Sequence, residues 1–217
     1  MDATSVDTIH IAKVKECVHP HDAKDYNEDA ADAIKRMSAH IKCVAVGECG
    51  LDFNRNFSPP DTQLRVFEEQ VKLACDLQKP LFIHEREAHA DMARILTQYR
   101  ETLPSTVIHC FTGTVEEAEK YISMGLYVGL TGFLWKDKLP NGVQQALRAR
   151  AIPLDRLLIE TDAPFMYPNY CSFERNEPCA LPVIVDMIAG FMDVERELVA
   201  RCTTENAVKV FALTAVK

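Results

Sequence analysis

The sequence predicts an α/β protein built around a parallel sheet. Short, almost continuously apolar runs recur along the chain, and longer segments with helical spacing separate them. Strands that are apolar throughout are typical of a parallel sheet covered on both faces. The alternation of strands with helices favours βαβ units with right-handed crossovers. Polar side chains stand at the ends of the apolar runs, and they bear on function.

Six apolar runs are strand candidates. They are "VKECVHP", "CVAVGECG", "PLFIHER", "STVIHCF", "LYVGLTG" and "RLLIETD", at 14–20, 43–50, 80–86, 105–111, 126–132 and 156–162. Two architectures compete for such a series: a doubly wound open sheet and a (β/α)₈ barrel. Both place functional groups at the carboxyl ends of the strands. Neither a G-x-G-x-x-G nor a P-loop motif occurs, so nothing supports a nucleotide cradle.

Helices are predicted between the strand candidates and after them. Residues 60–78 place apolar side chains at helical spacing and charged side chains elsewhere. A T-x-x-E capping box that begins at Thr114 predicts a helix through about Met124. Residues 165–180 look irregular, and 181–212 read as helices only.

Composition is that of an ordinary globular protein with one domain over 1–217. The chain is 47% apolar and 26% charged, and its net charge is −8. An acidic chain argues against a module that wraps nucleic acid, but not against an enzyme that grips a few phosphates. We find no membrane span, no secretory signal and no C-x-x-C pair among eight scattered cysteines, and we expect a cytoplasmic protein.

Acidic and histidine side chains end five of the six candidate strands. The strand-end residues are His19, His21, Asp22, Glu48, Asp52, His84, Arg86, His109, Glu160 and Asp162. Any one histidine after an apolar run is more often a core residue, and a single Asp there is usually a turn residue. Equivalent ends of parallel strands meet at one edge, however, so Glu48, His84, His109 and Asp162 should converge.

Such a convergence predicts a metal site. Ionisable groups are costly to bury together unless they neutralise one another or bind a cation. Imidazole with carboxylate and no thiolate suits Zn²⁺, Mn²⁺ or Mg²⁺ with open coordination positions. A site of this kind activates water and polarises a phosphoryl or carbonyl oxygen.

Several longer motifs resemble one family. From about Val18 to the C-terminus the chain is similar to the TatD family of metal-dependent deoxyribonucleases, in the order "CVHPHD", "GECGLDFNRNFS", "FIHERE", "VIHCFTG", "GLYVGLTG", "LLIETDAP" and "RNEP". The resemblance implies a TIM-barrel hydrolase that cleaves DNA phosphodiester bonds, typically as a Mg²⁺-dependent exonuclease. Mn²⁺ and Zn²⁺ are the alternative ions, and a eukaryotic member could be nuclear.

The resemblance also assigns roles to residues. It implies that Glu48, His84, His109 and Asp162 are metal ligands, with Glu48 and Asp162 also catalytic. It places Arg86 and His19 near the site, where we expect them to bind the substrate phosphate, with His21 as an alternative to His19.

The start of the chain departs from the family pattern. Relatives open with an H-x-H strand and a second strand, and nothing here resembles them. With six strand candidates of eight, we expect an incomplete barrel with an exposed gap, which "DTIHIAK" (7–13) or a second chain would cover. Two alternatives stay open: a metal-dependent hydrolase of amides, lactones or esters, and a catalytically impaired or non-catalytic protein.

Overall fold

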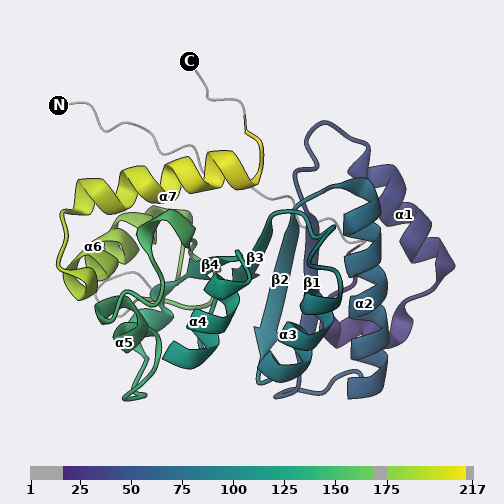
Figure 1. Ribbon diagram of the computed structural model, residues 1–217, viewed down its shortest axis with the longest axis horizontal. Helices are drawn as coiled ribbons and strands as arrows, with labels where there is room; N and C mark the ends of the chain where they lie inside the picture. The colour runs from purple at the N-terminus through teal and green to yellow at the C-terminus, as the bar shows by residue number, and fades with distance from the viewer. Residues whose placement is uncertain (1–16, 169–174, 214–217) are drawn as a thin grey trace.

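Five parallel strands form the centre of the structure, a computed structural model that describes residues 17–168 and 175–213. Their order in the sheet is their order in the chain (Figure 1): β1 (Val46–Asp52), β2 (Leu81–Arg86), β3 (Thr106–His109), β4 (Tyr127–Leu130) and β5 (Leu157–Ile159). The predicted α/β class is therefore confirmed. Because the sheet grows in one direction, it resembles the wall of a barrel and not a doubly wound sheet, which reverses direction at a switch point.

Helices separate the strands along the chain, and most of them pack on one face of the sheet. The longer helices are α1 (Glu28–Ser38), α2 (Pro60–Leu77), α3 (His89–Gln98), α4 (Val115–Ser123), α5 (Val143–Arg148), α6 (Leu181–Met192) and α7 (Arg196–Val210). Short 3₁₀ turns occupy Pro20–Asp25, Gly132–Trp135, Leu154–Arg156 and Pro178–Ala180. The helices predicted over 60–78, from Thr114 and within 181–212 are all present, and Thr114 forms the predicted capping box with Glu117.

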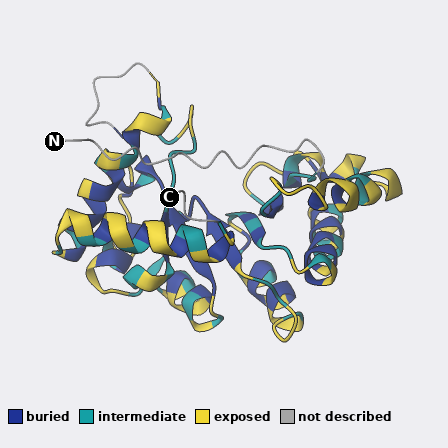
Figure 2. Ribbon diagram, turned by 90° about the horizontal axis from the view of Figure 1, so that it is seen from above, coloured by how far each residue is buried: buried dark blue, intermediate teal, exposed yellow. Residues whose placement is uncertain are grey.

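The alternation of side chains along each strand gives the sheet two different faces. Leu81, Ile83 and Ile108 point into the main core, which the helices share. Figure 2 shows this division on the helices, whose inward faces are buried while their outward faces are exposed. Among the described helices, none combines the length and apolar character that a membrane crossing requires.

The other face, here called the inner face, is covered at the amino ends of its strands by the end of helix α7. Val210 and Phe211 pack with Val107 and Tyr127 in a second, smaller core. The ring of Phe211 lies 6.5 Å from that of Phe82, centroid to centroid. The inward side chains at this end are therefore buried. The segment "DTIHIAK", predicted to cover the gap in the barrel, lies outside the described residues.

The first strand candidate, 14–20, is wrong as far as the structure describes it. Residues 17–19 form no strand, and a 3₁₀ turn begins at Pro20. Both backbone groups of Val18 are bound by the side-chain amide of Gln70, at 3.0 Å each. The side chain of a glutamine from α2 thus makes the two hydrogen bonds that a neighbouring strand would make. The described residues contain five of the six predicted strands.

Candidate metal centre

Strand β1 presents Glu48 because glycines flank it. Gly47 and Gly50 have φ values of +150° and +146°, a region that L side chains rarely adopt. A Cβ atom at either position would collide with the carbonyl oxygen of Phe82 or His84 on β2. The two glycines let β1 approach β2 closely and turn the Glu48 carboxylate toward the inner face.

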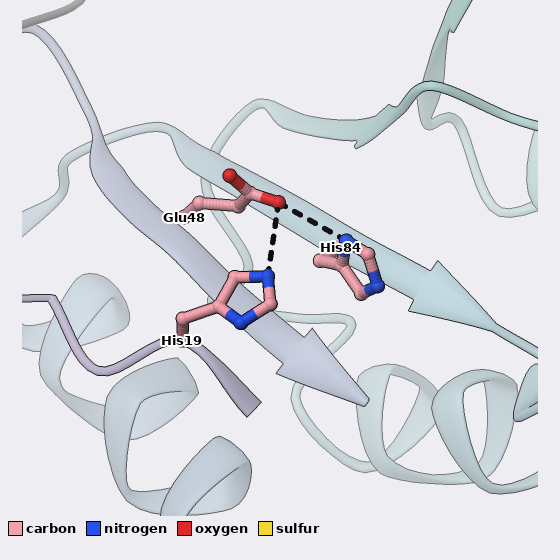
Figure 3. Close-up of side chains that lie close together, drawn as sticks. All are labelled: His19, Glu48 and His84. Atoms are coloured by element: carbon pink, nitrogen blue, oxygen red, sulfur yellow. Dashed lines mark hydrogen bonds and ion pairs between the residues drawn. The ribbon is translucent and has the colours of Figure 1, made fainter. Parts of the chain in front are cut away.

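Three histidines surround one oxygen of the Glu48 carboxylate. Glu48 Oε1 lies 3.0 Å from His84 Nδ1, 3.3 Å from His19 Nε2 and 3.6 Å from His109 Nε2. Figure 3 shows His19 and His84 approaching the carboxylate from the 3₁₀ segment and from β2. The ligand atoms of His19, Glu48 and His84 all lie within 4.8 Å of one another, so one ion could reach all three.

A second group adjoins the first at the end of β3. It comprises His109, Cys110 and Asp162, and His109 Nε2 lies 3.9 Å from Asp162 Oδ1. Burial, followed by the nearby Glu160 carboxylate, raises the pKa of the Cys110 thiol well above its usual range. Burial also raises the pKa of Asp162, although His109 opposes this. This group therefore offers an imidazole, a thiol and a carboxylate, and Glu48 lies between it and the first group.

Two further carboxylates, those of Asp52 and Glu160, contact the ring nitrogens of His84 and His109 that face away from Glu48. His84 Nε2 lies 3.2 Å from Asp52 Oδ2, and His21 Nε2 lies 2.9 Å from the same oxygen. His109 Nδ1 lies 2.6 Å from Glu160 Oε2. A carboxylate without its proton can only accept, so the far nitrogens of His84 and His109 carry hydrogen.

Electrostatics of the cluster follow from these contacts. Burial would raise the pKa of Glu48, but hydrogen bonds from His19 and His84 outweigh it and bring the pKa well below its usual range. Burial would lower the pKa of His109, but Glu160 and Glu48 raise it to about 9. Glu48 thus stays ionised, and its negative charge would favour a bound cation.

The residues present fit a divalent metal ion. Metal-binding histidines almost always donate their other ring N–H to a carboxylate, a carbonyl or water. His84 and His109 both do so, which leaves His84 Nδ1 and His109 Nε2 facing Glu48. The donors are imidazole nitrogens and carboxylate oxygens, the set that suits Zn²⁺, Mn²⁺ or Mg²⁺.

Comparison with known proteins gives the family. The model of the family described as TatD related DNase matches residues 14–212. The chain belongs to this family. It is 44% identical over 202 residues to the 3'-5' ssDNA/RNA exonuclease TatD of Erwinia billingiae, covering 91% of this chain and 77% of that protein. It is 41% identical to the protein of the same name from Citrobacter rodentium, at 91% and 76% coverage.

Solved structures give the same result for the fold. A TatD homologue of Escherichia coli K12 superposes with a TM-score of 0.81 at 26% identity, covering 91% of this chain and 75% of the other. A TatD family hydrolase of Entamoeba histolytica gives 0.77 at 24% identity, at 91% and 73% coverage. The barrel-type fold is thereby confirmed, and the family and the donor set together point to a divalent metal ion.

The structure brings the predicted TatD-type ligands together and adds to them. Glu48, His84, His109 and Asp162 converge, and their roles stay a prediction. His19, predicted to bind phosphate, lies within the first candidate ligand group.

Arg86 lies two residues after His84 and therefore on the same face of β2. Among the described residues its guanidinium has no hydrogen-bond or ion-pair partner. It is therefore available to a ligand at the carboxyl end of the sheet.

Sequence reasoning gave no role to the orienting carboxylates, Asp52 and Glu160. Both stand at strand ends, and Asp52 is fully buried. The signal that could have found them is their spacing: each lies in the same short motif as a predicted ligand, Glu48 or Asp162.

Asn176, of the "RNEP" motif, is also buried, and its amide donates to the carbonyl groups of Thr161 and Phe165. This contact pins the loop that follows Asp162.

Proposed function

We propose that this TatD family member is a metal-dependent nuclease that hydrolyses phosphodiester bonds of DNA, acting as an exonuclease with Mg²⁺. The observation that carries the proposal is the group of three imidazoles around Glu48 at the carboxyl ends of the strands. The relatives named 3'-5' ssDNA/RNA exonucleases, at 41–44% identity, support the choice of substrate.

The chain's own residues have distinct parts in this reaction. His19, Glu48, His84 and His109 would hold the ion, which supplies Lewis-acid charge to the phosphate and acidifies water. Asp162 lies at the carboxyl end of the sheet, and its side chain is 29% exposed. It would act as a further ligand or as the base that takes the proton of the attacking water. Arg86 would bind the phosphate oxygens through its guanidinium, whose two parallel N–H groups match them.

A cleavage assay tests the proposal. The wild-type protein should release nucleotides from the end of a labelled single-stranded oligonucleotide with Mg²⁺ or Mn²⁺, and EDTA should abolish this. Glu48→Gln should lose at least a hundredfold in rate, because it removes the charge that the histidines share. Glu101→Gln, whose side chain is 81% exposed beside Arg100, is the matched control and should retain full activity.

Three results would contradict the proposal. They are cleavage that is indifferent to EDTA, cleavage that survives Glu48→Gln, and hydrolysis of small amides or esters without cleavage of DNA or RNA. The last would favour the alternative that the fold serves another substrate.

A further inference from the structure

Exposed aromatic rings gather at one end of the molecule. Among the described residues, the aromatic side chains that are exposed are Phe57, Trp135 and Phe165, at 60%, 37% and 69%. They follow strands β1, β4 and β5, and so lie at the carboxyl ends of the strands, where the candidate metal centre lies. The described tyrosines are buried or half-buried. Rings exposed at this end of the sheet are placed to contact a ligand bound at the candidate metal centre.

Phe57 is held firmly although its ring is exposed. Its ring packs edge-on against His21, 4.8 Å between centroids, and His21 in turn contacts Asp52. Next to it, the buried hydroxyl of Ser58 accepts from the Lys24 N–H and donates to the His21 carbonyl. The ring is thus presented by a backbone that is fixed to the site.

Phe165 is held in a similar way on the other side. Its N–H donates to the carbonyl of Asp162 at 2.8 Å, and its own carbonyl accepts from the buried amide of Asn176. Phe57 follows β1 and Phe165 follows β5, the two edge strands of the described sheet. The two rings therefore come from opposite edges of the sheet, and each belongs to a segment that contacts the residues of the candidate metal centre.

The charge of the chain indicates what such rings would bind. Strong binding through phosphates alone requires many cationic contacts, and this chain carries 32 acidic against 24 basic residues. Stacking of bases on aromatic rings contributes affinity without net positive charge, and it requires unpaired bases.

We propose that Phe57 and Phe165 are stacking platforms for unpaired nucleobases on either side of the phosphate held at the metal centre. This inference rests on the proposed nuclease function and names the side chains that would hold the unpaired bases of its substrate. Each ring would take one base, so that the terminal nucleotide and its neighbour are splayed apart across the cleaved bond.

The test combines two variants with two modified substrates. Phe57→Leu and Phe165→Leu keep an apolar side chain but lose the flat ring. Each should raise the KM for a single-stranded oligonucleotide by about fivefold or more, the lower end of the effect of removing one stacked base. An abasic site at the terminal or the penultimate position should raise the KM of the wild-type protein similarly.

Combining a variant with an abasic site identifies the base that each ring holds. When the abasic site removes the base that the missing ring would hold, the KM of the variant should not rise further. When the abasic site is at the other position, the two increases in KM should multiply. In parallel, 2-aminopurine at the same two positions reports stacking by its fluorescence, which is a readout independent of cleavage. Ile41→Ala, 92% exposed in the segment before β1, is the control and should match the wild type.

Several outcomes would overturn the inference. They are an unchanged KM in both variants, equal losses on intact and abasic strands, and loss of self-association in the variants without any effect on the oligonucleotide. A wild-type protein that cleaves no nucleic acid would instead count against the proposed function, whereas failure of the stacking inference would show only in the variants.

Discussion

At the scale of single residues, the Asp52 carboxylate connects two histidines that lie far apart in the sequence. Its Oδ2 faces both His21 and His84, and its Oδ1 accepts the N–H groups of Asn54 and Arg55. Burial would raise the pKa of Asp52, but the hydrogen bonds from His84 and His21 bring it below its usual range. Asp52 thus remains an acceptor and fixes the orientation of His84 toward Glu48.

Replacing Asp52 tests this orienting role. In Asp52→Asn an amide N–H faces the two imidazole N–H groups, so His84 loses the partner that fixes its ring. We expect the Kd for Mn²⁺, measured by calorimetric titration, to rise about 10- to 100-fold. Asp76→Asn, exposed on α2, is the control. Equal affinity in Asp52→Asn and the wild type would remove Asp52 from the site.

Residue types at strand ends were enough to predict where the ligands converge, because parallel strands bring their carboxyl ends together. The same reasoning could not assign Asp52 or Glu160, since a carboxylate that binds an ion and one that orients a histidine look alike in sequence. It also put His19 with the phosphate, because the approach of His19 to Glu48 depends on how the 3₁₀ segment docks, which no local pattern encodes.

At the scale of elements, the segment that carries His19 depends on helix α2. The Gln70 side chain is fully buried and bonds both backbone groups of Val18, the residue before His19. Cys17 contributes as well, because its Sγ accepts the Gly47 N–H of β1 at 3.1 Å. Hydrogen bonds from side chains hold this segment, and not the backbone hydrogen bonds of a sheet. The predicted strand was wrong because an apolar run looks the same in sequence in both cases. The five other strands were predictable from continuous apolar runs, and the helices over 60–78, from Thr114 and within 181–212 from helical spacing and a capping box.

Removing the Gln70 amide should affect both stability and metal binding. Gln70→Leu leaves the two backbone groups of Val18 without partners, which we expect to lower the free energy of unfolding by about 1–3 kcal/mol. The Kd for Mn²⁺ should rise with it, because His19 is no longer held near Glu48. Urea unfolding and metal titration measure the two effects.

The control for this change lies on the same helix. Lys72→Gln, on the exposed face of α2, should change neither quantity by more than the error of measurement. A Gln70→Leu protein with wild-type stability and wild-type metal affinity would show that the segment is held by other contacts.

At the scale of the whole molecule, α7 joins the last part of the chain to the inner face of the sheet. Phe211 is only 7% exposed and shares a small core with Val107 and Tyr127. This core lies beneath His84 and His109, since Phe82 and Val107 are the preceding inward residues of the same strands. The packing of a distant helix against this face was not predictable, because the buried positions of α7 include the polar Thr203 and Asn206 and because topology sets its partner.

Truncating Phe211 tests this closure. Phe211→Ala should lower the free energy of unfolding by about 3 kcal/mol, the lower end of the cost of deleting a buried phenyl ring. Lys209→Ala, exposed on the same helix, should cost little. Denaturant unfolding provides the measurement, and a loss below 1 kcal/mol in Phe211→Ala would mean that α7 does not close the inner face.

The central claim is that imidazoles and carboxylates from separate strands meet around a divalent ion. Anomalous diffraction from crystals grown with Mn²⁺ tests it most directly. The account predicts a peak about 2.0–2.3 Å from a Glu48 oxygen and from ring nitrogens of His19 and His84, with a second position near His109 and Asp162. An anomalous peak elsewhere, or no peak in this cluster at saturating Mn²⁺, would contradict the account.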